Sequence, residues 1–229
     1  MAGNWNWERP HHEPAFNIPT VILVFTAICV ILYTVSSFLP DWFYNNLAEY
    51  FVFVPSYSFS SHNILTSLSI LGYSFMHASW MHLLANMVWF VIFGSPLANR
   101  IGAKRFIALW LVSAVVSILP FYLLHLNDIT AVVGASGVIS ALMGAAGRYG
   151  FERVQNVQGG HSEFQGPVMS IENALRSQRV IFLIGFWIIT DLSIGIMGNS
   201  NVAWEAHIAG LIFGFLAIPL FDPRPSSRY

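Results

Sequence analysis

A serine and a histidine stand in two stretches of the sequence that are otherwise almost wholly apolar. Ser136 lies in the run Gly-Ala-Ser-Gly, and His207 lies in the run Ala-His-Ile-Ala-Gly. A hydroxyl group becomes a nucleophile when a neutral imidazole beside it can take its proton. We therefore predict that Ser136 is a nucleophile and that His207 is its base.

Two further polar residues lie near the start of another apolar stretch. His82 and Asn86 are four residues apart, so both project from one face of a helix. Their side chains can donate hydrogen bonds to an oxyanion that forms during acyl transfer, and the backbone N–H of Ser136 can add a third donor. The sequence thus predicts an oxyanion site made of His82, Asn86 and Ser136.

The composition indicates the solvent in which these residues act. Hydrophobic residues make up 55% of the chain and charged residues only 9%, whereas a soluble domain has roughly 25% charged residues. We expect an all-α polytopic membrane protein. The net charge of -1 gives no reason to expect a nucleic-acid partner, and the single cysteine excludes an internal disulfide.

Six apolar stretches are candidates for spanning a hydrocarbon layer of about 30 Å as helices. They cover residues 18–39, 81–98, 106–124, 134–147, 180–197 and 202–221. The fourth is short, because its 14 residues rise only about 21 Å. It must begin below the membrane surface or continue through Arg148. In the first case the preceding connection dips inward, which is tolerated only around a polar or water-filled cavity.

The lysines and arginines fall at the two ends of the chain and in alternate connections between the predicted spans. Because cytoplasmic connections of membrane proteins are enriched in lysine and arginine, both termini and the connections 100–105 and 148–179 are expected in the cytoplasm. The connections 41–80, 125–133 and 198–201 are then expected on the outer side.

The predicted domain organisation follows from the spans. We expect a cytoplasmic tail over 1–17, a membrane domain over 18–221 and a second cytoplasmic tail over 222–229. Residues 1–17 show no cleavable signal pattern, so the first span is expected to remain as an anchor. This organisation favours a multi-pass protein of a bacterial inner (plasma) membrane, in contact with membrane lipid. The sequence indicates no oligomeric state.

Two connections invite an interpretation. The first outer connection, 41–80, is rich in aromatic residues and has no lysine or arginine, which predicts a long loop lying in the membrane interface. The stretch 155–166 is polar and contains glycine, and we interpret it as a plain linker.

The second, fourth and sixth spans all begin on the outer side and carry their polar residues early. His82, Asn86, Ser136 and His207 are therefore expected at one depth in the outer leaflet, where three helices can assemble a site. Small residues recur every four positions next to the serine and the histidine, as Gly137-x-x-x-Ala-x-x-x-Ala and Ala-x-x-x-Gly-x-x-x-Gly214. Such ladders let two helix backbones approach closely.

In these motifs, in their order and in the number of spans, residues 18–221 resemble the rhomboid family of intramembrane serine proteases. The resemblance implies a six-helix bundle with a Ser–His dyad and no third acidic member, which cleaves membrane-spanning segments of other proteins near the outer surface. Carried over by position, Ser136 is the nucleophile, His207 the base, and His82 and Asn86 the oxyanion donors. His77 matches a position at which these proteins often have histidine.

The sequence departs from the family pattern at two places. Many rhomboids have a Trp-Arg pair in the first outer loop, where this chain has Leu68 and Ser69. Many also have an aromatic residue four positions after the serine that packs on the catalytic imidazole, where this chain has Ser140. These differences concern the anchoring of the loop and the support of the ring.

The acidic residues near the site are expected to be structural. Asp191 lies towards the outer end of the fifth span, where it could reach water or a neighbouring donor. Glu205 precedes His207 by two residues, hence lies on another helical face and is not expected to orient its ring. Asp191 stands alone as a membrane acid, which argues against an aspartyl intramembrane protease.

Other classes fit the sequence less well. The main alternative is a rhomboid-like pseudoprotease that binds and escorts transmembrane segments without cleavage, and the intact Ser136 and His207 argue against it. No metal and no cofactor is expected, because the eight histidines show no zinc-ligand spacing. A transporter or a haem-binding bundle would need broken helices at mid-depth or paired axial histidines, and neither is evident.

Overall fold

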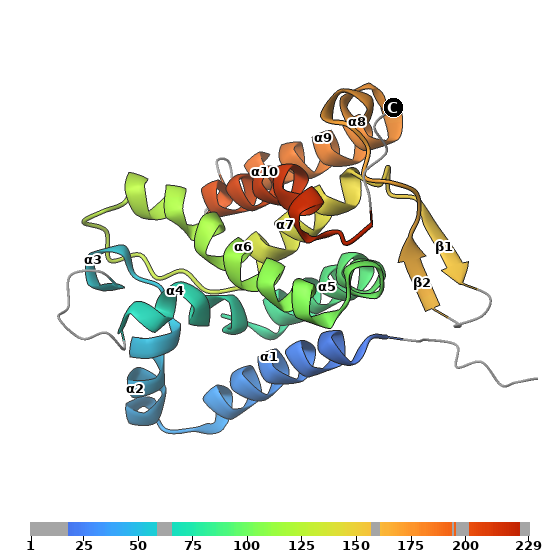
Figure 1. Ribbon diagram of the computed structural model, residues 1–229. Helices are drawn as coiled ribbons and strands as arrows, with labels where there is room; N and C mark the ends of the chain where they lie inside the picture. Colours follow the sequence, from blue (N-terminus) through green and yellow to red (C-terminus); the bar gives the residue numbers. More distant parts are fainter. Residues whose placement is uncertain (1–17, 59–65, 157–160, 194, 196–201, 225–229) are drawn as a thin grey trace, which may run out of the picture.

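The computed structural model describes residues 18–58, 66–156, 161–193, 195 and 202–224 (Figure 1). Its long helices are α1 (Thr20–Phe38), α5 (Trp80–Ile101), α6 (Ala103–Leu124), α9 (Gln178–Leu192) and α10 (Trp204–Phe221), with the shorter α7 (Ser136–Gly147) among them. The smaller elements are α2 (Asp41–Phe51), α3 (Pro55–Ser58), η1 (Thr66–Leu68), α4 (Ser69–Gly72), η2 (Tyr73–Phe75), β1 (Arg153–Asn156), β2 (His161–Phe164) and α8 (Ile171–Arg176). The predicted tail over 1–17, the part 225–229 of the predicted tail over 222–229, and the outer connection 198–201 lie outside the described residues.

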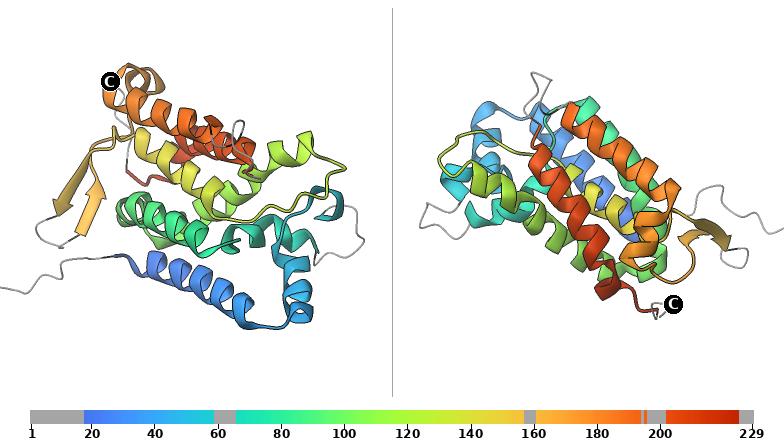
Figure 2. Two further views of the ribbon diagram at one scale, coloured as in Figure 1. Left: turned by 180° about the vertical axis from the view of Figure 1, so that it is seen from behind. Right: turned by 90° about the horizontal axis from the view of Figure 1, so that it is seen from above.

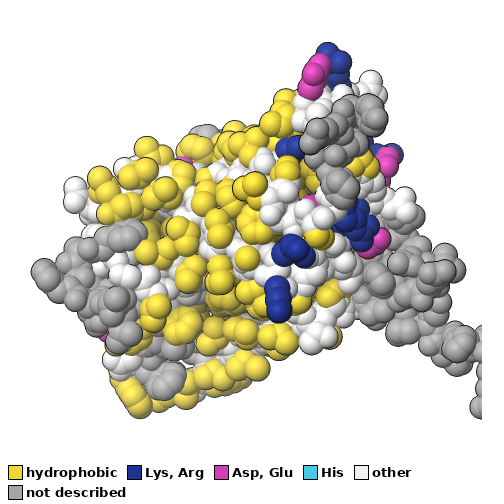
Figure 3. Space-filling model, viewed as in Figure 1, with side chains coloured by type: hydrophobic (Ala, Val, Ile, Leu, Met, Phe, Trp, Pro, Cys, Tyr) yellow, Lys and Arg dark blue, Asp and Glu magenta, His cyan; other side chains and the backbone are white. Residues whose placement is uncertain are grey.

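The helices α1, α5, α6 and α10 are long and apolar enough to cross a membrane, and α7 is a shorter apolar helix. Large apolar side chains point outward from these helices, among them Leu84, Leu119 and Leu220. Hydrophobic side chains cover much of the molecular face, whereas Lys and Arg gather towards the end that carries β1, β2 and α8 (Figure 3). The prediction of an all-α membrane protein is confirmed. Of the predicted stretch 180–197, residues 180–192 lie in α9, and the described positions 193 and 195 continue it as π-helix.

Helix α7 lies at the centre of the bundle, next to α10, α5 and α6 (Figures 1 and 2). All of its residues after the first are buried. The helix ends at Gly147, so it does not continue through Arg148. Ala135, just before the helix, is fully buried. The connection therefore enters the bundle before the helix begins.

Glycine makes the contact between α7 and α10 possible. A Cβ atom on Gly210 would overlap the carbonyl of Gly137, and one on Gly214 would overlap the carbonyl of Ala141. From the other helix, a Cβ on Gly144 would overlap the carbonyl of Leu211. As predicted, the two backbones touch along the ladders of small residues.

The first outer connection is folded rather than spread out. Its described backbone forms α2, α3, η1, α4 and η2, and its aromatic side chains differ in burial. Phe53 and Tyr73 are fully buried, whereas Trp42 and Tyr57 are exposed. Part of this connection thus packs against the helices of the bundle.

The interpretation of 155–166 as a plain linker was wrong. Its described residues contribute to β1 and β2, which form an antiparallel hairpin that pairs Arg153 with Phe164. Phe164 is fully buried and its ring stacks on Tyr149, with centroids 5.4 Å apart. Beside it, Arg100 donates to the Phe164 carbonyl and forms a buried ion pair of 2.8 Å with Asp222. A buried apolar residue in a polar stretch thus helps to dock the hairpin on the bundle.

Candidate active site

The chain reaches Ser136 through a short, tightly held segment. The backbones of Phe53 and Val132 exchange two hydrogen bonds, and the N–H of Gly134 donates to the Tyr73 carbonyl at 2.9 Å. The hydroxyl of Tyr73 in turn donates to the Ala114 carbonyl of α6 at 2.8 Å. The first outer connection therefore fixes the segment that leads into α7, and with it the position of Ser136 at the first residue of the helix.

Gly134 has a conformation that few other residues adopt. Its φ is +127°, in the region that favours glycine. A Cβ atom at this position would lie only 2.8 Å from Cε1 and Nε2 of His82. The glycine two residues before Ser136 thus allows both the turn of the chain and the close approach of the His82 ring.

Ser136 and His207 are in direct contact. The Oγ atom of Ser136 lies 2.7 Å from Nε2 of His207, although the two residues are 71 positions apart in the sequence. His207 is in the first turn of α10, beside the start of α7. The structure therefore brings together the predicted nucleophile and base at hydrogen-bonding distance.

A third side chain completes this arrangement. Oδ1 of Asp191, from α9, lies 2.5 Å from Nδ1 of His207. The residue is 9% exposed. When Nδ1 carries the proton and donates it to the carboxylate, Nε2 is left with a lone pair that can accept the Ser136 proton. The row Asp191–His207–Ser136 has the connectivity of a nucleophile, a base and a group that orients the base.

Sequence reasoning did not assign Asp191 to this row. The prediction that it could reach a neighbouring donor is borne out by its contact with the His207 ring, but the identity of that donor was missed. The two residues are on separate helices, so no periodicity relates them. The one available signal was a carboxylate in an apolar stretch, at the same end of its helix as the other polar residues.

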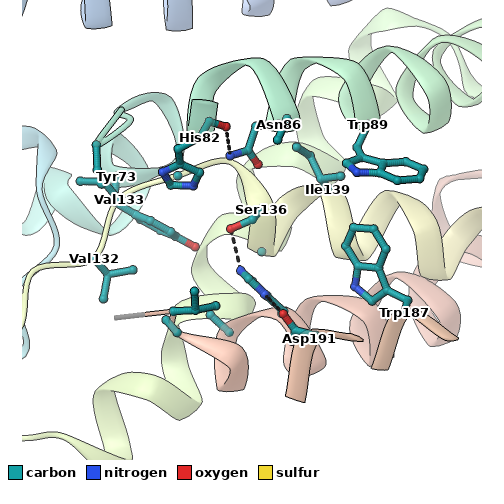
Figure 4. A pocket seen from close by; sticks show the side chains of 18 of the residues that line it. Tyr73, His82, Asn86, Trp89, Val132, Val133, Ser136, Ile139, Trp187 and Asp191 are labelled. Atoms are coloured by element: carbon teal, nitrogen blue, oxygen red, sulfur yellow. Dashed lines mark hydrogen bonds and ion pairs between the residues drawn. The ribbon is translucent and has the colours of Figure 1, made fainter. Parts of the chain in front are cut away.

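The predicted oxyanion donors lie on the other side of Ser136. Figure 4 shows His82 and Asn86 on α5, facing Ser136 across the cavity from Asp191. The Nδ2 group of Asn86 donates to the His82 carbonyl at 2.9 Å, which leaves its second N–H free to bind a ligand. Asn86 is buried and His82 is half-buried. The four predicted site residues thus line one cavity.

This cavity has a volume of about 710 Å³, large enough for several residues of a peptide. Its lining is mainly apolar, with the polar groups gathered around Ser136. Between α5 and α9 it is bordered by Trp89 and Trp187, whose rings meet edge to face with centroids 5.5 Å apart. Such a cavity suits an apolar peptide segment that presents one peptide group to the polar residues around Ser136.

The remaining residues singled out in the sequence have other partners. Glu205 binds Nε2 of His125 at 3.2 Å and, as expected, does not orient His207. His77 is buried with its ring 5.2 Å from that of His82. The hydroxyl oxygens of Ser69 and Ser58 are hydrogen-bonded at 3.0 Å, and Leu68 is exposed. Within the described ranges, no group of three histidine, cysteine or acidic side chains could hold a metal ion.

Residues 65–223 match the sequence profile of the rhomboid domain. Proteins named rhomboid protease GlpG from Yersinia pseudotuberculosis and Yersinia pestis are 32% identical over 158 residues, which is 69% of this chain and 49% of each relative. The chain thus spans about half the length of these curated relatives. A protein of the same name from Haemophilus influenzae is 28% identical over 196 residues, covering 86% of this chain and 88% of the relative.

Proposed function

This chain belongs to the rhomboid family, and we propose that it is an intramembrane serine endopeptidase that hydrolyses peptide bonds in or next to the membrane-spanning segments of other proteins. The observation that carries the proposal is the contact of 2.7 Å between Ser136 Oγ and His207 Nε2 at the wall of a cavity between apolar helices. Relatives named rhomboid protease support the same class of reaction.

In the proposed reaction, the Oγ atom of Ser136 attacks the scissile carbonyl carbon while Nε2 of His207 takes the hydroxyl proton. The carbonyl oxygen becomes an oxyanion that accepts hydrogen bonds from His82, Asn86 and the backbone N–H of Ser136. The imidazolium then gives its proton to the leaving nitrogen as the C–N bond breaks. His207 then takes a proton from a water molecule as the water oxygen attacks the acyl ester, the bond between the acyl carbon and Ser136 Oγ breaks, and His207 returns the proton to Oγ as the second product leaves.

The proposed topology places the site near the outer face of the membrane. The four long apolar helices, together with α7 and α9, make six spans over residues 18–221, with tails over 1–17 and 222–229. The Lys and Arg side chains gather at the hairpin end (Figure 3), which supports a cytoplasmic location for that end. The first outer connection then lies in the opposite interface. A bacterial inner membrane is the proposed compartment, in keeping with the bacterial relatives.

The test is to label the full-length protein in liposomes with a fluorophosphonate probe and to follow cleavage of a single-span reporter. Ser136→Ala and His207→Ala are each expected to lower the cleavage rate by about 10³-fold or more. Ser140→Ala is the matched control, because Ser140 is on the same helix, fully buried, and its hydroxyl has no hydrogen bond within the described part of the chain.

The outcomes separate the candidate functions. Labelling and cleavage that depend on Ser136 and His207 but not on Ser140 support the protease. Cleavage that survives in Ser136→Ala overturns the assignment of the nucleophile. Reporter binding without labelling or cleavage by the wild-type protein favours the pseudoprotease that escorts transmembrane segments.

A further inference from the structure

We infer that Asp191 is a positioning residue for His207, so that the site works as a Ser–His–Asp triad rather than as a dyad. The inference rests on the proposed function, because it assigns a role within that reaction. Its basis is the contact of 2.5 Å between Oδ1 of Asp191 and Nδ1 of His207, on the far side of the ring from Ser136.

Within the described residues, the His207 ring is the hydrogen-bond partner of the Asp191 carboxylate. The Oδ2 atom of Asp191 is buried and has no hydrogen bond within the described ranges. A carboxylate that serves only to stabilise a fold is usually held by several donors, because a buried acceptor without a partner is unfavourable. Here the buried acid is aimed at one nitrogen atom of one side chain.

The position of the acid fits the needs of the reaction. His207 must present its neutral Nε2 lone pair to Ser136 and then carry a full positive charge in the transition state. The carboxylate favours the tautomer with the proton on Nδ1 and stabilises the imidazolium that follows. In a cavity with mainly apolar walls, such an interaction is stronger than in water.

The neighbourhood of the ring makes this support necessary. Ser140, four residues after Ser136, is a small buried side chain that offers no aromatic face to the imidazole. The other titratable side chains that line the cavity are Tyr73 and His82. Neither brings a negative charge to the ring, because a tyrosine is neutral near pH 7 and a histidine is neutral or positive. The orientation of the base therefore depends on α9, through Asp191.

Asp191→Asn tests the inference with little change of shape. We expect kcat for the reporter to fall by roughly 10²- to 10⁴-fold with KM nearly unchanged, because the amide neither fixes the tautomer nor stabilises the imidazolium. The matched control is Glu205→Gln, the same change at an acid bonded to His125 instead of His207. This control is expected to keep kcat within about threefold of the wild type, the scatter for changes away from the reacting groups.

Two readouts distinguish positioning from a structural role. In Asp191→Asn the acid limb of the kcat profile should move to lower pH, because the charge that favours the imidazolium is gone. In the wild-type protein, nitrogen-15 NMR of labelled histidine should show His207 with its proton on Nδ1 at neutral pH. The NMR measurement holds even if the variant does not fold.

Either of two results overturns the inference: a folded Asp191→Asn protein with the wild-type rate and pH profile, or a wild-type His207 with its proton on Nε2. Those results leave the proposed protease intact as long as Ser136→Ala and His207→Ala remain inactive. If those two variants retain activity, the proposed function fails and the inference fails with it.

Discussion

Gly214 of α10 lies so close to Ala141 of α7 that a Cβ atom on the glycine would overlap the alanine carbonyl. One turn earlier, Gly210 meets Gly137 in the same way. This backbone contact sets the distance between the two helices, and the helices carry Ser136 and His207 at their first turns. The 2.7 Å contact between the serine and the histidine therefore depends on glycines that take no part in the chemistry.

Gly214→Val is expected to push α7 and α10 apart. Overpacking of this kind destabilises a protein by about 1–3 kcal/mol, and here the added carbons meet backbone atoms, which cannot move aside as a side chain does. We expect a lower melting temperature together with loss of fluorophosphonate labelling at Ser136. Differential scanning fluorimetry and gel-based labelling measure the two effects.

Gly185→Ala is the control for that variant. Gly185 is also a helical glycine, in α9, but a Cβ atom there would have no neighbour within 4 Å. This change is expected to leave labelling unaltered and not to lower the melting temperature, because alanine favours a helix more than glycine does. If Gly214→Val labels like the wild type, the two helices tolerate separation and the contact is not what holds the site together.

Gly134→Ala should disturb the oxyanion side of the site. The new methyl group would lie within 3 Å of the His82 ring, at 2.8 Å from two of its atoms, and the backbone would be forced into a conformation that costs about 1–2 kcal/mol for an alanine. We expect kcat to fall by roughly 10- to 10³-fold as the donor is displaced. Reporter cleavage under saturating conditions gives the value.

Gly166→Ala separates the clash from the backbone strain. Gly166 also has a positive φ, +73°, but a Cβ atom there would have no neighbour within 4 Å. The Gly166→Ala change should lower the stability of the protein while leaving kcat unchanged. Equal losses of kcat in both variants would mean that strain, rather than contact with His82, explains the effect at Gly134.

Asn86→Ala is expected to remove one donor to the oxyanion. Loss of a single donor of this type lowers kcat by about 10²- to 10³-fold with little change in KM, because the bond forms mainly in the transition state. Asn99→Ala is the control on the same helix, since Asn99 donates at 2.9 Å to the Ser162 carbonyl near the other end of α5. A raised KM with unchanged kcat in Asn86→Ala would assign Asn86 to substrate binding instead.

Much of this site could be predicted because membrane helices leave few choices for polar residues. Ser136, His82 and His207 could be placed at one depth from the order of the spans alone, and the small-residue ladders indicated which helices touch. The partner of Asp191 could not be predicted, since it depends on the rotation of α9 against α10, and hydrophobic periodicity does not report rotation when nearly every face of a helix is apolar.

The connections were harder to predict than the spans. The hairpin depends on the burial of Phe164 against Tyr149, a contact between residues in a stretch whose composition is typical of linkers. The first outer connection was predicted from its aromatic content to lie in the interface, and that content did not reveal that Phe53 and Tyr73 face the interior of the bundle. Aromatic composition indicates an amphipathic environment, and it does not say which rings face inward.

Acidification is expected to lower the activity for two separate reasons. Protonated His207 cannot accept the Ser136 proton, so cleavage should fall as the imidazole takes up a proton. Folding stability should fall as well, because burial, followed by the proximity of His82, lowers the pKa of His77 from its ordinary value of 6.5 to about 4. Between these two pH values, His77 is protonated in the unfolded chain but not in the folded chain. The free energy of unfolding therefore decreases as pH falls from about 6.5 to about 4, and it levels off at lower pH.

His77→Phe distinguishes the two effects, because it fills the buried space with a ring that does not titrate. The melting temperature of this variant should depend less on pH between 6.5 and 4 than that of the wild type, while the acid loss of kcat should persist. Labelling at each pH, compared with the folded fraction at the same pH, gives the two terms independently. Wild-type labelling that falls only in step with unfolding would show that protonation of the base is not what ends the activity.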